Sequence, residues 1–384
     1  MPKRKRNLVF ALSLCALSTA GLTIGTSAAD ADQRSVAAGQ TAHASHVPGR
    51  PAAVLDASVT FESGVYTVSW RGGRSQITVV ASNDPDSTVA GKTVGSGSAS
   101  GSIRVRGLDP NQRWYFHLRR TRGDIVVVST QGLGLVNAPN LRDLGGYRTG
   151  DGKRVKPGLL FRGDSMSDLS DSELAMVARL DLSKVIDLRT PDEVAHHPDR
   201  LPPGVQHVSD SVFDPEDPYA TGVVSALDEA KTFELMGYAS GGYLGMNAEL
   251  GGAPRPTYAY RKLFAEIVQA QGKPVLFHCS VGDDRTGWAA YVLLRLLGAA
   301  DSDAVDDYLD SNTFNHDVLV DYTKRYKSLG FTQDQADLSL KASYIHAALK
   351  AAVQVYGSFD DYVRVGLGLT AEDVKTLRAG YLTA

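Results

Sequence analysis

The sequence predicts a small all-β sandwich followed by an α/β domain in which helices flank a mainly parallel sheet. Two patterns lead to this fold class. Short strands of alternating polarity recur at intervals of about ten residues between residues 51 and 133. From residue 134 to residue 384, short apolar runs typical of buried strands alternate with segments of helical periodicity. The chain is therefore expected to contain two folded regions.

Residues 1–29 have the three parts of a secretory signal peptide. Four basic residues at 3–6 precede an apolar segment at 8–24, and small residues at 27–29 offer a cleavage point. Ser and Thr interrupt the apolar segment too often for a membrane span. We therefore expect a secreted, extracellular protein without a stable membrane anchor. The polar residues 30–50 are expected to form a linker.

Residues 51–133 carry the strands of the expected sandwich. These strands are expected at residues 65–70, 76–80, 103–105, 114–118 and 125–128. Trp70, together with the run from Leu108 to Phe116, resembles a fibronectin type III module. The sequence of this region shows no catalytic set. We therefore expect either a spacer or a module that docks to a cell-surface or extracellular polymer.

Residues 134–384 read as alternating strands and helices. Strands are expected to end at residues 160–162 and to cover residues 184–188 and 274–277. A capped helix is expected from Asp171 to Leu180, and another over residues 258–271. After Gly298 the chain is expected to be helical almost to its end. This alternation predicts parallel strands whose carboxyl ends share one edge, where open α/β sheets place their sites.

The most informative stretch is residues 278–287, which joins the strand at 274–277 to a helix expected from Trp288. A loop that enters a helix directs unpaired backbone N–H groups at one point and favours an anion there. A cysteine at that point, Cys279, is held as a thiolate. Arg285 can offer two phosphate oxygens a bidentate fork. This combination equips the loop to move a phosphoryl group onto sulfur. A buried structural thiol beside a surface arginine would leave the strand–loop–helix context unexplained.

The number of cysteines supports the same interpretation. The chain has two, Cys15 and Cys279, and Cys15 lies in the expected signal peptide. A secreted chain with one remaining cysteine cannot form an internal disulfide, so its thiol is expected to have a chemical use.

Charge and ligand spacing disfavour several other classes. The formal charge of −3 would fall by four, to −7, on removal of residues 1–29, which disfavours a nucleic-acid partner. No cluster of histidines and acids has ligand spacing, and His196-His197 is only a weak adjacent pair. We expect neither a metal nor another cofactor.

Several segments together resemble the atypical bacterial tyrosine phosphatases. They are residues 140–147 (NLRDLGGY), 161–162, 186–189 with Glu193, and 278–287. Members of that family are often secreted, and some also dephosphorylate phosphoserine, phosphothreonine or phosphoinositides. The resemblance extends from about residue 135 to the end of the chain. It implies a cysteine-phosphatase-like fold for this region.

Two positions depart from the family pattern. Leu141 replaces the usual phenylalanine, and Asp283 stands where the family usually has a lysine. That lysine adds positive charge beside the phosphate and is associated with lipid head groups, so Asp283 argues against phosphoinositide substrates. The loop also resembles that of the myotubularin lipid phosphatases, which carry an acid immediately before the arginine, as Asp284 does here.

The expected roles follow from the chemistry of the loop. Cys279 is expected to attack phosphorus and form a thiophosphate intermediate. The backbone N–H groups of Ser280, Val281, Gly282 and Asp283 are expected to hold the phosphoryl oxygens together with Arg285. The hydroxyl of Thr286 could stabilise the sulfur as it leaves. His278 is expected to orient the loop from beneath rather than to act as a base. Arg142, Asp143 and Arg189 could support the loop or contact the substrate, and support is the preferred role.

Two aspartates compete as the general acid that protonates the leaving oxygen. Asp214 lies in a Pro-containing loop at residues 212–218 that could swing over the site, and it is the preferred candidate. Asp284 lies inside the loop that carries the cysteine, and Asp210 and Asp217 are next in line.

The leading hypothesis is a secreted, metal-free phosphatase that acts on phosphotyrosine in a protein or on a small phosphomonoester. Phosphoserine and phosphothreonine are a natural extension of this range. The alternatives are a phosphoinositide phosphatase and a catalytically weak protein that binds phosphorylated ligands. A further alternative makes the sandwich the working part of the chain.

Overall fold

The computed structural model describes residues 40–41, 55–72, 75–86, 91–120, 125–213, 247–248, 250–328 and 330–383. The expected signal peptide at residues 1–29, all but two residues of the expected linker, and the candidate acid Asp214 lie outside these ranges. Across the described ranges, no helix is both long enough and apolar enough to span a membrane.

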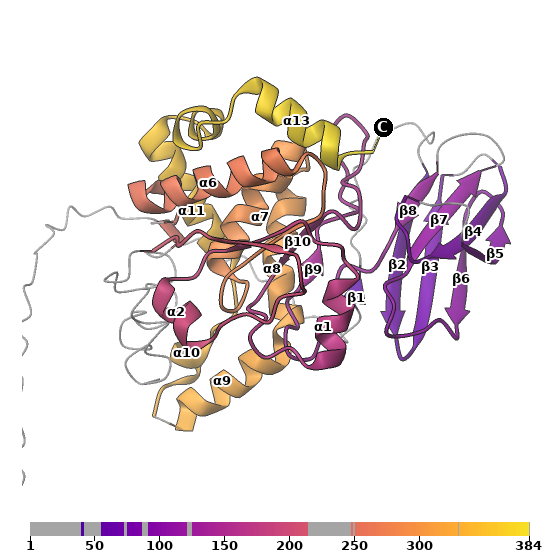
Figure 1. The fold of residues 1–384 in the computed structure, drawn as a ribbon, viewed down its shortest axis with the longest axis horizontal. Helices are drawn as coiled ribbons and strands as arrows, with labels where there is room; N and C mark the ends of the chain where they lie inside the picture. Colours follow the sequence, from indigo (N-terminus) through magenta and orange to yellow (C-terminus); the bar gives the residue numbers. More distant parts are fainter. Residues whose placement is uncertain are drawn as a thin grey trace, which may run out of the picture. The chain divides into compact units, whose positions relative to one another are not determined.

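The first part of the described chain forms two antiparallel sheets of four strands each (Figure 1). One sheet has the order β1 (Gln40–Thr41), β2 (Asp56–Glu62), β3 (Val65–Arg71), β6 (Gly101–Arg106). The other has the order β5 (Lys92–Gly97), β4 (Ile77–Ser82), β7 (Tyr115–Arg120), β8 (Val126–Val128). Apolar side chains of both sheets share one buried cluster, which includes Val68, Trp70, Val79, Phe116 and Leu118. The fibronectin type III resemblance stays a prediction.

The second part is built on a mixed sheet of five strands. Its order is β12 (Gln206–Ser209), β11 (Lys184–Asp187), β13 (Val275–His278), β10 (Leu160–Gly163), β9 (Arg142–Asp143). The first four strands are parallel, and β9 pairs antiparallel at the edge. The mixed α/β class predicted from the sequence is confirmed. Because β10, β11, β12 and β13 are parallel, the residues that follow them meet at one edge.

The two faces of this sheet pack against different layers. Leu160, Ile186 and Phe277 belong to the larger core, which includes the long helices. Phe161, Val185 and Leu276, each one position away, belong to a second core with Val177 of the first helix. Since successive side chains of a strand point to opposite faces, strands covered on both sides read as continuous apolar runs.

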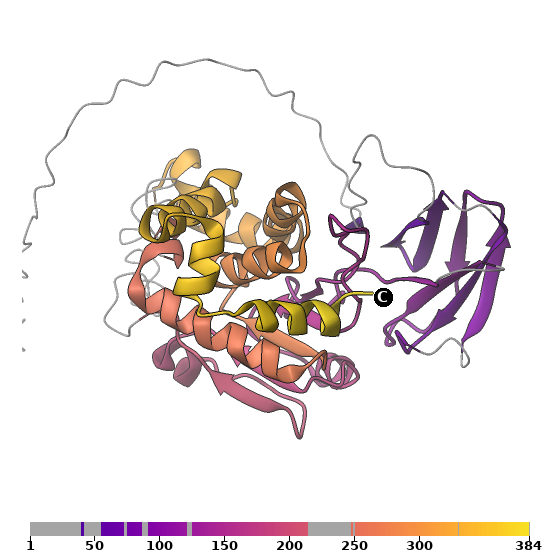
Figure 2. The same cartoon turned by 90° about the horizontal axis from the view of Figure 1, so that it is seen from above.

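Besides the helical residues at 247–248 and 250–252, eleven helical segments lie in the described part of this domain. They are α1 (Asp171–Ala178), α2 (Pro191–His196), α6 (Pro254–Ala270), α7 (Asp284–Leu297), α8 (Asp301–Phe314), α9 (His316–Ser328), α10 (Gln333–Ala336), α11 (Ala342–Tyr356), α12 (Phe359–Asp361), a π-helix (Tyr362–Gly366) and α13 (Ala371–Tyr381). Figure 2 shows α6 (orange) and α13 (yellow) lying side by side. The helix expected from Trp288 begins four residues earlier, at Asp284, so Asp284 and Arg285 lie in its first turn.

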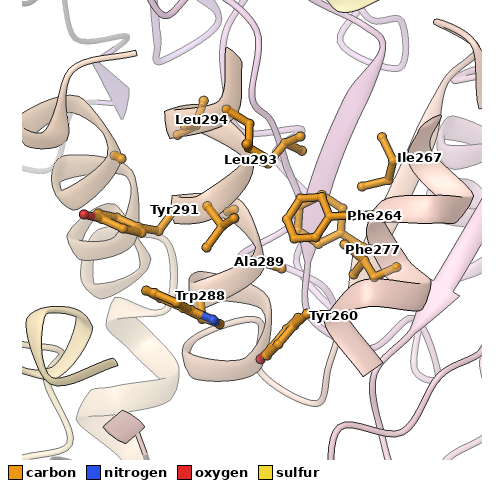
Figure 3. Close-up of a cluster of buried hydrophobic side chains, with 14 of the residues drawn as sticks. Tyr260, Phe264, Ile267, Phe277, Trp288, Ala289, Tyr291, Leu293 and Leu294 are labelled. Carbon is orange, nitrogen blue, oxygen red and sulfur yellow. The ribbon is translucent and has the colours of Figure 1, made fainter. Parts of the chain in front are cut away.

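The packing of α6 against α7 holds that first turn in place. Figure 3 shows Tyr260, Phe264 and Ile267 of α6 facing α7 around Phe277 of β13. The phenol of Tyr260 donates a hydrogen bond to the carbonyl of Arg285 (3.0 Å). Each fully buried side chain of this size contributes on the order of 2 kcal/mol. The core therefore fixes the start of α7, and with it the residues of the loop.

Candidate active site

The loop that carries Cys279 lies at the carboxyl edge of the sheet. It leaves β13 at His278, runs through residues 279–283 and enters α7. Cys279 is buried, and its N–H donates to the carbonyl of Gly163 at the end of β10 (3.4 Å). The backbone N–H groups of the following residues lie at the start of a fourteen-residue helix, a geometry that suits a phosphate. The structure thus brings the predicted nucleophile and the predicted anion cradle together.

Arg285 is held by the carboxylate of Glu193, a residue that the sequence pointed to only through the family resemblance. Its two terminal nitrogens donate to the two oxygens of Glu193, each at 2.8 Å. The hydroxyl of Ser280 donates to the same carboxylate. Burial would raise the pKa of Glu193, but the charge of Arg285 and these hydrogen bonds lower it to about 2. Glu193 is therefore ionised and fixes the direction of the guanidinium.

A local sequence signal places Glu193. It is the third residue of α2, where it closes a capping box with Thr190: the Thr190 hydroxyl accepts from the N–H of Glu193, and Glu193 accepts from the N–H of Thr190 (2.8 Å). Such a box is readable from Thr-x-x-Glu. The sequence could not show that the same carboxylate also binds Arg285, which lies 92 residues later in the chain.

His278 lies beneath the loop in a buried cluster of charges. Its Nε2 lies 3.2 Å from Asp199 and 3.8 Å from Asp187, and its Nδ1 lies 3.0 Å from the carbonyl of Cys279. Burial would lower the pKa of His278, but the two carboxylates raise it. Arg189 binds both Asp187 (2.8 Å) and Asp199 (2.7 Å). The supporting roles of His278 and Arg189 stay predictions, and the two aspartates were not predicted as part of the site.

The same cluster is the one group of described residues with the arrangement of a metal site. Asp187, Asp199 and His278 can each offer one ligand atom, all within 4.8 Å of one another. The guanidinium of Arg189 already lies against both carboxylates and supplies the positive charge that a metal would bring. The donor set therefore fits an ionic support of the loop better than a metal.

Asp284 is positioned by two donors. Its Oδ1 accepts from Nδ2 of Asn247 (2.9 Å) and from the hydroxyl of Tyr308 in α8 (3.1 Å). Burial outweighs these hydrogen bonds and raises the pKa of Asp284. A raised pKa suits a carboxyl group that must carry a proton.

Asp214 cannot be compared directly, because it lies outside the described residues. Phe213, its neighbour in the chain, is described, and the ring of Phe213 lies 5.7 Å from Cζ of Arg285. The chain therefore passes close to Arg285 immediately before it reaches Asp214.

The carboxyl group of Asp283 is buried, whereas the sequence suggested a negative charge beside the phosphate. Its side chain is only 7% exposed and accepts from the amides of Asn140 and Asn315, both at 2.9 Å. Burial and the nearby charge of Asp284 raise the pKa of Asp283 to about 7. The carboxyl group lies in the interior and not at the surface beside the phosphate position, so only the backbone of Asp283 is available to a substrate.

Arg142 and Asp143 lie at the antiparallel edge strand β9 and contact neighbouring segments of the chain. Arg142 is fully buried and donates to the carbonyl of Asp307 (2.6 Å), to Ser311 (3.1 Å) and to the side chain of Asn140. Asp143 accepts from the N–H groups of Gly145 and Gly158 and from Arg113, so it fixes the turn after β9.

Thr286 is fully buried, and its hydroxyl finds no hydrogen-bond partner among the described residues. It follows Arg285 in the first turn of α7. A hydroxyl in this situation is available to bind a group that arrives during the reaction.

The comparisons with known proteins agree with this geometry. The tyrosine phosphatase family matches residues 133–383, about two thirds of the chain. A protein of Cupriavidus necator, provisionally named a tyrosine-protein phosphatase, is 33% identical over 247 residues, which cover 63% of this chain and 85% of that protein. The triple specificity protein phosphatase PtpB of Mycobacterium tuberculosis is 29% identical over 279 residues, which cover 64% of this chain and 96% of that protein.

Among solved structures, TpbA of P. aeruginosa is 17% identical and covers 48% of this chain and 88% of its own. Its TM-score of 0.22 is too low to carry an argument about the fold. The family match and the named relatives identify the class of enzyme: the chain belongs to the tyrosine phosphatase family and is a protein-tyrosine phosphatase.

Proposed function

We propose that this protein hydrolyses phosphotyrosine, and by extension phosphoserine and phosphothreonine, through a thiophosphate on Cys279 and without a metal. The observation that carries the proposal is the loop itself. It combines a buried cysteine at the carboxyl edge of the sheet with the start of α7 and with an arginine oriented by Glu193. These parts supply a nucleophile, an anion cradle and a clamp.

In the first step the thiolate of Cys279 attacks phosphorus, and the bond between phosphorus and the substrate oxygen breaks. The N–H groups of residues 280–285 and the guanidinium of Arg285 bind the equatorial oxygens, on which charge develops. The leaving oxygen takes a proton from a carboxylic acid. Since Glu193 already directs the guanidinium, little reorganisation of Arg285 is needed.

In the second step a water molecule attacks the thiophosphate. The acid of the first step, now a carboxylate, takes the proton of the water, and the sulfur of Cys279 leaves as a thiolate. The buried hydroxyl of Thr286 stabilises the sulfur as it acquires charge. Inorganic phosphate is then released.

The general acid is one of two aspartates. The raised pKa of Asp284 and its place next to Arg285 support Asp284. The contact of Phe213 with Arg285 supports Asp214, the next residue of the chain. Both belong to the proposed catalytic set with Cys279 and Arg285.

The substrate range rests on the relatives. Their names give tyrosine-protein phosphatase, and in the Mycobacterium tuberculosis protein triple specificity. A phosphoinositide is the second candidate substrate, because the buried carboxyl of Asp283 does not present its charge beside the phosphate position.

Export and docking belong to the proposal as well. The basic, apolar and small-residue segments within residues 1–29 support secretion to the extracellular space. The sandwich would then act as a spacer or as a docking module for a surface polymer.

The experiment that tests this function compares the wild type with Cys279→Ser on phosphotyrosine peptides, phosphoserine peptides and phosphoinositides. We expect turnover of phosphotyrosine that is lost in Cys279→Ser, while the variant still binds phosphate. Wild-type activity should persist in excess chelator and be lost on alkylation of the thiol. Turnover by Cys279→Ser within tenfold of the wild type, or none by the wild type, would refute the proposal.

A further inference from the structure

A phosphate loop directs its N–H groups inward, so its carbonyl groups face the protein and need donors there. In this chain the carbonyl of Val281 accepts from Nδ2 of Asn140 (2.8 Å) and from Nδ2 of Asn315 (3.0 Å). These two asparagines come from segments that are distant in sequence. Asn140 precedes β9, and Asn315 ends α8.

The same two amide nitrogens also bind Asp283. Asn140 and Asn315 each donate to its Oδ1, both at 2.9 Å. Each amide nitrogen therefore donates one hydrogen bond to Oδ1 of Asp283 and one to the carbonyl of Val281. Because Oδ1 of Asp283 accepts both bonds, the nitrogen of each amide, and not its oxygen, faces the loop.

The residue between the two acceptors leaves the loop no room to relax. Gly282 has a positive φ of 75°, and a Cβ on it would lie 2.6 Å from the carbonyl carbon of Gly163 and 2.8 Å from Nδ2 of Asn140. Its carbonyl accepts from Arg162 (2.5 Å). Residues 281–283 are thus fixed against the end of β10 and against Asn140.

We propose that Asn140, Asn315 and Asp283 form a clamp that positions the phosphate loop. The carboxyl of Asp283 holds the amide of Asn315 on the carbonyl of Val281, and together with Arg142 it holds the amide of Asn140 there. Because that carbonyl points away from the phosphate position, the N–H groups of the residues that follow Val281 point toward the phosphoryl oxygens. Asp283 is then a positioning residue, and its side chain does not touch the substrate. The inference rests on the proposed function only in taking this loop as the phosphate site.

The clamp depends on acceptor and donor geometry more than on the charge of Asp283. The charged groups around Asp283 come from several elements: Asp284 of α7, Arg162 of β10, Arg142 of β9, and Asp164 after β10. An asparagine at position 283 can still turn its oxygen toward the two amides. Asp283→Asn should therefore preserve the clamp, whereas Asp283→Ala removes the shared acceptor.

The test measures the affinity for inorganic phosphate by calorimetry at pH 6, with KM and kcat on a phosphotyrosine peptide as a second readout. Asp283→Ala and Asn315→Ala should each weaken phosphate binding about tenfold, the loss expected for one good hydrogen bond. The double variant should lose little more than either single one, because the two residues act as one unit. Asp283→Asn should lose less affinity for phosphate than Asp283→Ala, because the oxygen of its amide can still accept from both asparagines.

Two outcomes would overturn the clamp. One is phosphate affinity within twofold of the wild type in both alanine variants, with urea midpoints that show them to be folded. The other is an Asp283→Asn loss as large as that of Asp283→Ala, which would make charge the cause. If Asp283→Ala does not fold, Asn315→Ser and Asp283→Asn decide the question by the same criterion. A wild type that binds phosphate but does not turn over phosphotyrosine would refute the proposed function and leave the clamp standing.

Discussion

The loop of residues 278–287, which we propose binds phosphate, is supported in two different ways on its two flanks. On the β11 flank, formed by Asp187, Arg189, Glu193 and Asp199, charged side chains bind the charged side chains of the loop, Arg285 and His278. On the α8 flank, formed by Asn140, Arg142, Arg162, Asp307 and Asn315, side chains bind the backbone carbonyls of the loop and one another. One flank therefore sets the charge of the site, and the other sets the shape of the loop.

This difference has a physical origin. A buried ion pair recovers the cost of leaving water only if its geometry is close to ideal, and the bidentate contact between Arg285 and Glu193 meets that condition. A backbone carbonyl carries no net charge, so it can be held by an amide or a guanidinium without a counter-ion of its own. Loss of one partner should accordingly affect catalysis on the β11 flank, and stability together with phosphate binding on the α8 flank.

The largest expected effect is the loss of kcat when the general acid is replaced. This loss shows which flank supplies the acid. Asp284 is bound to Tyr308 of α8, whereas Asp214 follows Phe213, which packs on Arg285. Replacing the true acid by asparagine should lower kcat on phosphotyrosine by about 10²–10⁴ and change turnover of an activated aryl phosphate much less. Asp284→Asn and Asp214→Asn should be compared on both substrates. If neither shows a loss that depends on the leaving group, both candidates are wrong.

The next effect concerns the stability of the α8 flank. Asp307 is fully buried and neutralises Arg142 (3.4 Å) and Arg162 (2.6 Å). Asp307→Asn leaves two buried guanidinium groups without a carboxylate, so we expect a loss of about 3–5 kcal/mol in the free energy of unfolding. Urea denaturation measures this loss. The control is Asp321→Asn, which removes an exposed pair with Lys324 and should change stability by less than about 1 kcal/mol. Equal losses in both variants would contradict the assignment.

A third prediction uses two glutamates in the same local motif. Glu193 and Glu173 each close a capping box as the third residue of a helix, but only Glu193 reaches the loop. Glu193→Gln should lower kcat/KM by about 100-fold, which corresponds to about 2.7 kcal/mol, because Arg285 loses its orienting charge. Glu173→Gln should lower the urea midpoint and leave kcat/KM within threefold. A kinetic loss of equal size in both variants would show that the cap, and not the contact with Arg285, is responsible.

The sequence was sufficient for those parts of the site that depend on neighbouring residues. The alternation of elements predicted the α/β class, and residues 278–287 predicted a loop between a strand and a helix. The start of α7 was predicted four residues late, because Asp284 and Arg285 read as loop residues until Tyr260 is seen to bind the first turn.

The rest of the site depends on contacts between distant segments. Asn140 meets Asn315 only after β9 and the end of α8 come together, and no local pattern marks either residue as a partner of Val281. Asp283 was interpreted from its charge alone. Its burial, which that interpretation did not include, is a property of the tertiary structure. Asp187 and Asp199 were missed for the same reason.

The smallest expected effect separates the two flanks by pH. On the β11 flank the pKa of Glu193 is lowered to about 2, so its contribution to stability is present above about pH 4.5 and is lost as the pH falls toward 2. The pKa of Asp164, which lies beside the α8 flank, is shifted in the opposite direction. Burial and the nearby Asp283 raise its pKa to about 8, so stability present below about pH 4 is lost as the pH rises toward 8.

Asp164→Asn removes this titration. The amide oxygen of the variant can still accept from the N–H of Asn140, as Oδ2 of Asp164 does at 3.4 Å. The variant should therefore gain stability relative to the wild type between pH 5 and pH 8, by on the order of 4 kcal/mol. Urea denaturation of both proteins at the two pH values measures the gain. Asp168→Asn, at an exposed position in the same loop, is the matched control. If the stability of Asp164→Asn relative to the wild type is instead the same at pH 5 and at pH 8, the pKa of Asp164 is not raised. That result would also mean that the α8 flank tolerates a charged carboxylate beside the clamp.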